Sequence, residues 1–72
     1  MIIEDERQLG ESLATLLRQH QYCADVVFDG VSGEEHAFTG IYDVILLDIM
    51  LPGKNGLNVL RSLREKHISP PI

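Results

Sequence analysis

The residues of this 72-residue chain that are best suited to chemistry are three acids, Glu4, Asp5 and Asp48. Glu4 and Asp5 follow the short apolar run at residues 1–3, and Asp48 follows the apolar run at residues 44–47. A short run that is apolar at every position is typical of a strand buried on both faces of a parallel sheet. In open parallel sheets, chemistry takes place just beyond the carboxyl ends of the strands. We therefore expect the three acids to meet at one edge of a sheet.

Three neighbouring carboxylates favour the binding of a cation. They repel one another, and the pKa of at least one of them rises unless a cation intervenes. Oxygen ligands suit a hard cation such as Mg²⁺, which typically takes one or two carboxylates together with waters and a phosphate oxygen. Asp48 would then act as a carboxylate nucleophile towards phosphorus, and the metal would offset charge on the transferring phosphoryl group.

Each acid taken alone also has a simpler structural interpretation. Glu4, Asp5 and Glu6 precede an expected helix, whose N-terminal end stabilises negative charge. Asp48 would likewise cap the loop after its strand. Taken together, and combined with the Pro- and Gly-rich turn at residues 48–56, the acids favour a functional site.

The rest of the chain supplies the elements that must position these acids. Apolar and β-branched runs predict three strands, at residues 1–3, 24–28 and 44–47. Helical periodicity and helix-end signals predict three helices, at residues 7–20, 31–39 and 57–66. The first helix is expected to bury one apolar face, which consists of Leu9, Leu13, Leu16 and Leu17.

Small residues and prolines predict where these elements end. Ser32 or Gly33 is expected to cap the second helix, and Gly40 to close it. In the loop after Asp48, Pro52 fixes φ, and the glycines at positions 53 and 56 are expected to allow positive φ. Residues 69–72 cannot continue a helix and are expected to lead into a further strand.

The alternation of strand and helix predicts an α/β fold. Strand–helix–strand units connect with right-handed crossovers, and they give a doubly wound parallel sheet. In a sheet ordered 2-1-3, the first and third strands are neighbours, so Glu4, Asp5 and Asp48 would converge. Residues 1–72 would form the first half of such a domain.

Composition excludes several classes of function. Six Lys and Arg against 11 Asp and Glu give a formal net charge of -5, which argues against nucleic-acid binding through phosphate contacts. One cysteine, Cys23, cannot form an internal disulfide and fits a reducing compartment. No apolar run approaches the roughly 20 residues of a membrane span. We therefore expect a cytoplasmic protein that does not contact the membrane.

The acids at residues 4–6 and the sequence from Val44 to Gly56 resemble the receiver domain of bacterial two-component response regulators. The resemblance covers all 72 residues and implies a flavodoxin-like fold and phosphorelay signalling. It implies that Asp48 accepts a phosphoryl group from a sensor histidine kinase. It also implies a Mg²⁺ site in which Asp48 and Asp5 bind directly, Glu4 binds through water and Met50 contributes its backbone carbonyl.

The sequence Asp-Ile-Met-Leu-Pro-Gly at residues 48–53 is similar to the corresponding segment of receivers that precede a winged-helix DNA-binding domain. The resemblance therefore implies regulation of transcription through an effector that is not present in these residues. It also implies a phosphoprotein signalling domain that is not itself an enzyme.

The resemblance does not extend to a whole receiver domain, which has five strands and five helices. Strands 4 and 5 and helices 4 and 5 have no counterpart in residues 1–72. Neither do the Ser/Thr that ends the fourth strand and the Lys that ends the fifth. Lys54 lies in the loop after Asp48 and is not that Lys. We therefore interpret the chain as the N-terminal part of a receiver domain and expect impaired phosphotransfer.

The third strand would then have an exposed apolar edge, which is a template for pairing with another chain. We expect a homodimer or strand-swapped oligomer formed through that edge, or an incompletely folded chain. An alternative function from a different class is a half-domain that acts only as an assembly module without phosphotransfer.

A phosphatase-type enzyme that turns over on Asp48 is a further alternative. Such an enzyme usually needs a second acid two residues later, where this chain has Met50. The remaining candidates for chemistry, which lack metal-ligand spacing or a neighbouring base, are His20, His36, His67 and Cys23.

Overall fold

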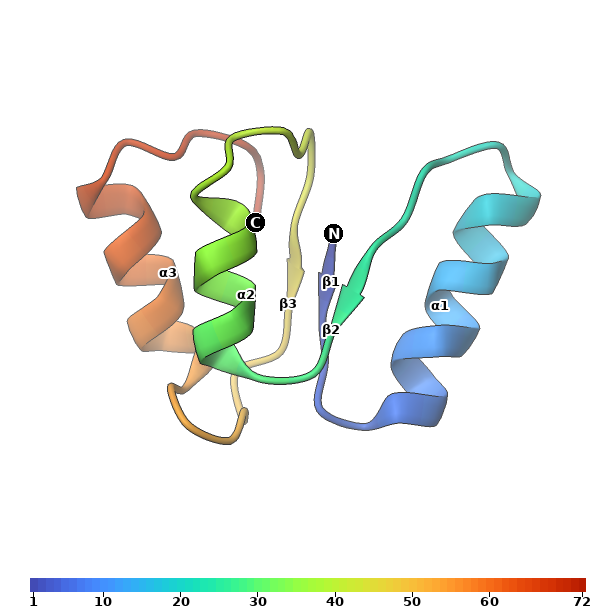
Figure 1. Cartoon of the computed structure of the whole chain (residues 1–72), viewed down its shortest axis with the longest axis horizontal. Helices are drawn as coiled ribbons and strands as arrows, with labels where there is room; N and C mark the ends of the chain where they lie inside the picture. The colour runs from blue at the N-terminus through green and yellow to red at the C-terminus, as the bar shows by residue number, and fades with distance from the viewer.

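Three parallel strands form the centre of the fold in the computed structural model, which describes residues 1–72 (Figure 1). The strands are β1 (Ile2–Ile3), β2 (Val26–Val27) and β3 (Leu46–Leu47). Their order across the sheet is β2-β1-β3, and both pairings are parallel. The predicted α/β class and strand order 2-1-3 are confirmed.

Each predicted strand extends beyond the two residues that pair in the sheet. The central strand sets this limit, because only Ile2 and Ile3 pair with both neighbours. Residues that flank the paired ones also form hydrogen bonds between the strands. The N–H of Ile2 donates to the carbonyl of Asp25 (2.8 Å), and the N–H of Leu46 donates to the carbonyl of Met1 (2.9 Å).

Helices cover both faces of the sheet (Figure 1). Helix α1 (Arg7–Gln19) lies on one face, and helices α2 (Gly30–Ala37) and α3 (Gly56–Glu65) lie together on the other. All three predicted helices are present, although α2 begins one residue and ends two residues earlier than predicted. None of the three is long and apolar enough to span a membrane.

The predicted cap of α2 is wrong: the N-cap is Asp29, not Ser32 or Gly33. One carboxylate oxygen of Asp29 accepts a hydrogen bond from the N–H of Ser32 (2.7 Å), and the other accepts from the Ser32 hydroxyl (3.0 Å). An aspartate accepts from the third helical N–H as well as a serine does, so the earlier acid starts the helix. The hydrogen bond from the Ser32 N–H also holds the pKa of Asp29 below its ordinary value of 3.8.

The core forms two clusters, one on each face of β1. Ile3 belongs to the larger cluster, under α2 and α3, and Ile2 belongs to the smaller one, under α1; both side chains are almost fully buried. The larger cluster contains Met1, Ile3, Val27, Ala37, Ile45, Leu51, Val59 and Leu63, and the smaller one contains Ile2, Ala14 and Ala24. The central strand is therefore buried on both faces, as its unbroken apolar run predicts. The same prediction for residues 44–47 is wrong: Ile45 is buried, but Val44 and Leu46 are about half exposed because β3 lies at the edge of the sheet.

The apolar face of α1 differs from the prediction. Leu13 and Leu17 pack against the smaller cluster, but Leu9 and Leu16 are about half exposed. Ala14 occupies the centre of the contact instead, together with the buried Gly10. The small residues at the centre of the contact let α1 approach the sheet closely. Leu9 and Leu16 lie at the margins of this contact and are only partly covered by the sheet.

The last residues of the chain lie along the outer edge of β3. The N–H of Ile45 donates to the carbonyl of Pro71 (2.9 Å), and the Arg64 guanidinium holds the carbonyls of Ile68 (2.6 Å) and Pro70 (3.0 Å). This arrangement agrees with the expected lead-in to a further strand. It also covers part of the edge that was expected to be open.

The Asp29 cap predicts a pH-dependent contribution to stability. Because the pKa of Asp29 is lower in the folded chain, its stabilisation is present above about pH 3.8 and is lost as the pH falls through the folded pKa. Asp29→Ala is expected to lower the free energy of unfolding by about 1 kcal/mol at neutral pH. Urea unfolding at neutral and acidic pH measures this loss.

Asp29→Asn keeps an acceptor for the helix but removes the titrating group. It is expected to retain most of the stability at neutral pH and to lose the pH dependence of the cap. Glu35→Gln, which removes an exposed charge from the same helix, is the control. A loss in Asp29→Ala that is equal at both pH values would contradict the assignment of the cap to the ionised carboxylate.

Candidate functional site

The carboxyl ends of β1 and β3 place the three acids at one edge of the sheet. Glu4 directly follows β1 and Asp48 directly follows β3, and the two strands pair with Ile3 opposite Leu47. The N–H of Asp48 donates to the carbonyl of Ile3 (3.0 Å), so the hydrogen bonding between β1 and β3 continues as far as Asp48.

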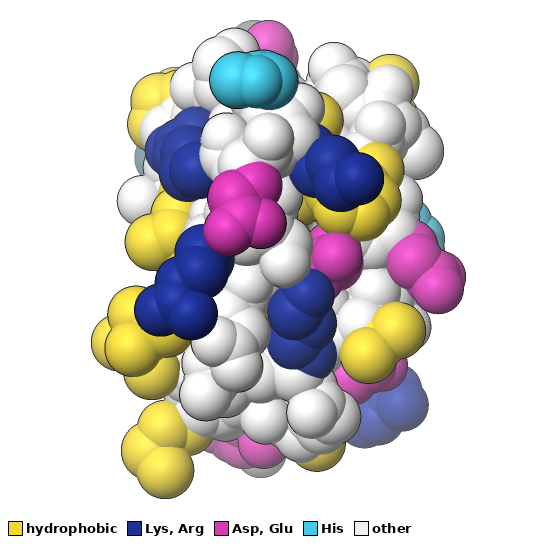
Figure 2. Space-filling view, turned by 90° about the vertical axis from the view of Figure 1, so that its left-hand side faces the viewer, with side chains coloured by type: hydrophobic (Ala, Val, Ile, Leu, Met, Phe, Trp, Pro, Cys, Tyr) yellow, Lys and Arg dark blue, Asp and Glu magenta, His cyan; other side chains and the backbone are white.

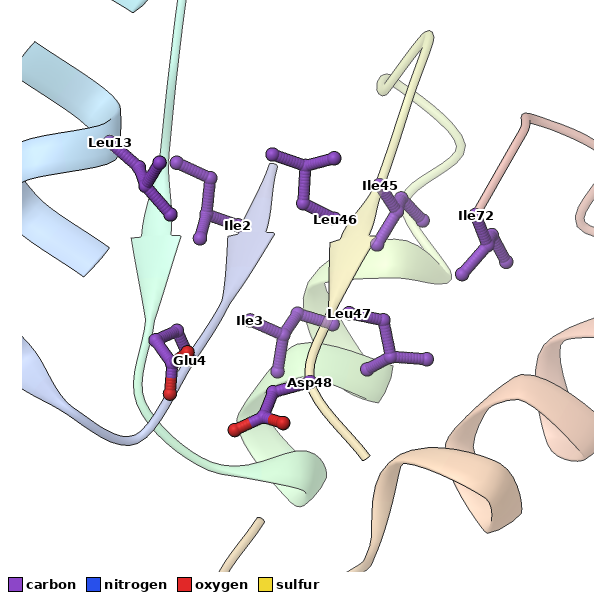
Figure 3. A pocket seen from close by; sticks show the side chains of 9 residues that line it. All are labelled: Ile2, Ile3, Glu4, Leu13, Ile45, Leu46, Leu47, Asp48 and Ile72. Atoms are coloured by element: carbon purple, nitrogen blue, oxygen red, sulfur yellow. The ribbon is translucent and has the colours of Figure 1, made fainter. Parts of the chain in front are cut away.

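The side chains of Glu4, Asp5 and Asp48 converge. Each offers a carboxylate oxygen, and the three oxygens lie within 4.8 Å of one another. Asp5 is exposed, while Glu4 and Asp48 are half-buried. Figure 3 shows Glu4 and Asp48 side by side at one end of a groove whose remaining length is apolar.

This groove has a volume of about 390 Å³ and runs along β1 and β3 (Figure 3). Its apolar lining comes from two strands, one helix and the end of the chain, and includes Ile2 of β1, Leu46 of β3, Leu13 of α1 and Ile72. The acids therefore have solvent on one side and a low-dielectric wall on the other.

The crowding of the carboxylates affects the pKa of Glu4. The N–H of Glu6, which donates to the Glu4 carboxylate at 3.2 Å, lowers this pKa, but desolvation and the neighbouring carboxylates of Asp48 and Asp5 raise it. The net result is a pKa above the ordinary value of 4.5. Negative charge at this edge is thus electrostatically unfavourable, and a bound cation would relieve it.

The loop after β3 orients the Asp48 carboxylate. The N–H of Met50 donates to Asp48 Oδ1 at 3.3 Å, and the Met50 side chain is 82% exposed. The N–H of Gly56 closes the loop on the carbonyl of Ile49 (2.7 Å). The site therefore combines three carboxylates with a loop whose backbone contacts one of them.

The glycines of this loop serve two different purposes. Gly53 has a φ of +77°, as the sequence predicts. The prediction of a positive φ for Gly56 is wrong: a side chain there would collide with the backbone carbonyl of Asp48, so this position needs space. Both glycines shape the loop beside the phosphoacceptor candidate.

The donor atoms of this cluster are all carboxylate oxygens, which fit a hard divalent cation such as Mg²⁺. It is the one grouping of three or more His, Cys, Asp or Glu side chains in the chain with metal-binding geometry. No histidine belongs to it, and Cys23 is an exposed free thiol. The chemistry of the ligands thus agrees with the cation expected from sequence.

Sequence reasoning missed one contact near the site. Lys54, in the loop that follows Asp48, forms an ion pair with Glu34 of α2. The two residues are 20 positions apart in sequence, and no local pattern relates them.

Comparison with known proteins assigns the family. The family model for the response regulator receiver domain matches residues 1–72. The transcriptional regulatory protein DltR of Streptococcus agalactiae is 44% identical to this chain over 72 residues, which are 100% of the chain and 32% of that protein. CusR of Escherichia coli, also a transcriptional regulatory protein, is 42% identical over 72 residues, again with 100% and 32% coverage. The chain therefore spans about a third of the length of these relatives.

Solved structures agree with this assignment. The Francisella response regulator 1452 receiver domain superposes with a TM-score of 0.92 at 28% identity, over 97% of this chain and 58% of that one. The BeF3-activated N-terminal receiver domain of Klebsiella pneumoniae RstA gives 0.84 at 37% identity, over 90% and 56%. Receiver domains of this kind are signalling domains and bind Mg²⁺ in an acidic pocket. The chain therefore belongs to the response regulator receiver domain family, whose members act in phosphorelay signalling.

Proposed function

We propose that Asp48 of this chain accepts a phosphoryl group from a sensor histidine kinase. The observation that carries this proposal is the convergence of the Glu4, Asp5 and Asp48 carboxylates within 4.8 Å at the carboxyl edge of the sheet. Asp48 is the member that directly follows the apolar run at residues 44–47, and the Met50 N–H donates a hydrogen bond to its carboxylate.

The reaction needs one bond to form and one to break. A carboxylate oxygen of Asp48 attacks phosphorus, and the bond between phosphorus and the histidine nitrogen of the kinase breaks as the aspartyl phosphate forms. The electron pair of the broken bond stays on that nitrogen. The hydrogen bond from Met50 to Oδ1 restricts the orientation of the attacking group.

The proposed cofactor is Mg²⁺, held directly by Asp5 and Asp48, through water by Glu4, and by the backbone carbonyl of Met50. When bound, it would neutralise negative charge on the transferring phosphoryl group. The raised pKa of Glu4 supports this, because desolvation and the neighbouring carboxylates of Asp48 and Asp5 both disfavour its negative charge, which a cation would stabilise.

We propose that the output of the signal is regulation of transcription in the cytoplasm. Supporting evidence is that relatives such as DltR and CusR are transcriptional regulatory proteins about three times the length of this chain. The DNA-binding effector, of winged-helix type, would belong to the part of such a protein outside residues 1–72. These residues would be the N-terminal part of a receiver domain, and their own phosphorylation would be slow without the family's Ser/Thr and Lys.

A second copy of the chain is the proposed partner at β3. Val44 and Leu46 are 49% and 45% exposed at this margin of the sheet, and the Pro71 contact covers only the N–H of Ile45. An unpaired strand edge next to exposed apolar side chains favours pairing with another copy, including strand-swapped forms. The alternative of an assembly module without phosphotransfer has no observation in its favour.

Phosphorylation at Asp48 is the first test. Incubation with Mg²⁺ and acetyl phosphate is expected to add the mass of one phosphoryl group, and Asp48→Asn is expected to abolish the addition. Intact-mass spectrometry measures this directly. Asp43→Asn, which removes an exposed charge just before β3, is the control and is expected to behave as the parent chain. Equal addition to Asp48→Asn would refute Asp48 as the acceptor.

Metal binding at Asp5 predicts that Asp5→Asn is more stable than the parent chain without Mg²⁺ and less stable than it with Mg²⁺. Without Mg²⁺ at neutral pH, Asp5→Asn is expected to stabilise the chain, because one of three repelling charges is removed. With Mg²⁺ at about 100 times Kd, the parent should gain about 2.7 kcal/mol, and Asp5→Asn should gain much less. Thermal unfolding with and without Mg²⁺ tests both, with Glu11→Gln on the exposed face of α1 as control. The same gain in parent and Asp5→Asn would exclude Asp5 as a ligand.

Self-association is tested by light scattering over a range of concentrations. The parent chain is expected to form dimers, and Leu46→Lys is expected to shift it to monomer by placing a charge at the exposed margin of β3. Leu16→Lys places the same charge on the exposed side of α1, away from this edge, and should not change association. A folded monomer at all concentrations would rule out this proposal.

A further inference from the structure

The loop between β3 and α3 (residues 48–55) is fixed against the start of α2. The N–H of Gly30 donates to the carbonyl of Pro52 at 3.4 Å. The carbonyl of Lys54 contacts Gly30 so closely that position 30 has no room for a side chain. The backbone of the loop thus packs directly on the first turn of α2.

The side chain of Lys54 adds a second connection. Its ammonium pairs with the carboxylate of Glu34 on α2 and donates to the hydroxyl of Ser62 on α3 at 2.7 Å. One charged group therefore joins the loop to both helices on this face of the sheet. We refer to the contacts among Lys54, Glu34 and Ser62 as the Lys54 bridge.

The Lys54 bridge differs from an ordinary surface ion pair in its burial. The Glu34 side chain is 18% exposed and that of Lys54 is 31% exposed. Glu34 Oε2 is shielded from solvent, and Lys54 is its charged partner. Removing Lys54 would leave the shielded Glu34 carboxylate without its counter-ion, which costs more than the loss of an exposed pair.

Other cations on the same face of the molecule have no such arrangement. Figure 2 shows Lys and Arg side chains spread over the α3 face. Lys66, at the end of α3, is exposed and forms no ion pair. It therefore provides a control that removes the same charge from the same face.

The loop held by the Lys54 bridge is the one that contacts the phosphoacceptor. Met50 lies four residues before Lys54, and its N–H reaches Asp48 Oδ1 at 3.3 Å, a length at which a small shift breaks the contact. The Met50 carbonyl, the proposed metal ligand, belongs to the same segment. Displacement of the loop would move both groups away from the acids.

We propose that Lys54 is a positioning residue for the acidic site, which it supports through Glu34 and Ser62 by fixing the loop that carries Met50. This inference rests on the proposed function, because the loop is argued to serve metal binding at Asp48. Outer residues that orient metal ligands typically contribute about 10- to 100-fold to metal affinity.

The test compares Lys54→Met, Glu34→Gln and Lys66→Met with the parent chain. Lys54→Met keeps most of the aliphatic stem and removes the charge. We expect Lys54→Met and Glu34→Gln to weaken Mg²⁺ binding about tenfold, measured by calorimetry on folded chain. In metal-free protein, they are expected to speed hydrogen exchange at the Met50 amide. Lys66→Met is expected to change neither quantity.

Two further variants separate positioning from general stability. Lys54→Arg keeps the positive charge and is expected to retain most of the Mg²⁺ affinity. Lys54→Glu combined with Glu34→Lys reverses the pair and is expected to recover affinity that Lys54→Glu alone loses. Urea unfolding of each variant gives its stability separately.

The outcomes distinguish this inference from the proposed function. If Lys54→Met lowers only the free energy of unfolding, while its Mg²⁺ affinity and Met50 exchange match those of Lys66→Met, the positioning role is wrong and the proposed function stands. If the parent chain binds no Mg²⁺ and Asp48 accepts no phosphoryl group, both are wrong.

Discussion

The parallel pairing of β1 with β3 is the constraint on which the site depends. These two strands are joined through only two residues each, yet that register brings the residue after β1 beside the residue after β3. The pairing holds because Ile2 and Ile3 are buried on opposite faces of the sheet, each in its own core cluster. A slip of one residue would exchange these faces and also separate Glu4 from Asp48.

The same register creates an electrostatic cost. Folding brings Asp48 beside Glu4 and Asp5, and desolvation together with these neighbouring carboxylates raises the pKa of Glu4. In the absence of a cation, protonation of Glu4 favours the folded state, so this part of the stability decreases as the pH rises through the folded pKa. A pKa that is perturbed by neighbouring carboxylates in a groove marks a candidate functional site.

Much of the fold and the acidic cluster could be predicted from sequence, because both depend on local patterns. The unbroken apolar run at residues 1–3 identified a doubly buried strand, and the alternation of elements identified the parallel sheet. The similar run before Asp48 identified a strand but not its burial, because no helix covers Val44 and Leu46 and both are about half exposed. The predictions that failed involve choices between equivalent local signals or contacts across the fold. Asp29 and Ser32 are both good caps, so local preference could not decide between them. The need for glycine at position 56 follows from the Asp48 carbonyl that packs against it, which is a tertiary contact.

The Lys54 bridge is the clearest case of information that the sequence does not contain locally. A half-buried ion pair is commonly no more stabilising than an apolar pair of the same size, so stability by itself is a weak reason for its presence. Its directional contacts, however, define one position for the loop: an ammonium that must meet a carboxylate on α2 and a hydroxyl on α3 has few alternative placements. An apolar side chain at position 54 could slide along the same helices with little loss of contact. A loop whose backbone must contact Asp48 benefits from the more restrictive arrangement, because a displacement of about 1 Å at a reacting site can cost about 100-fold in rate.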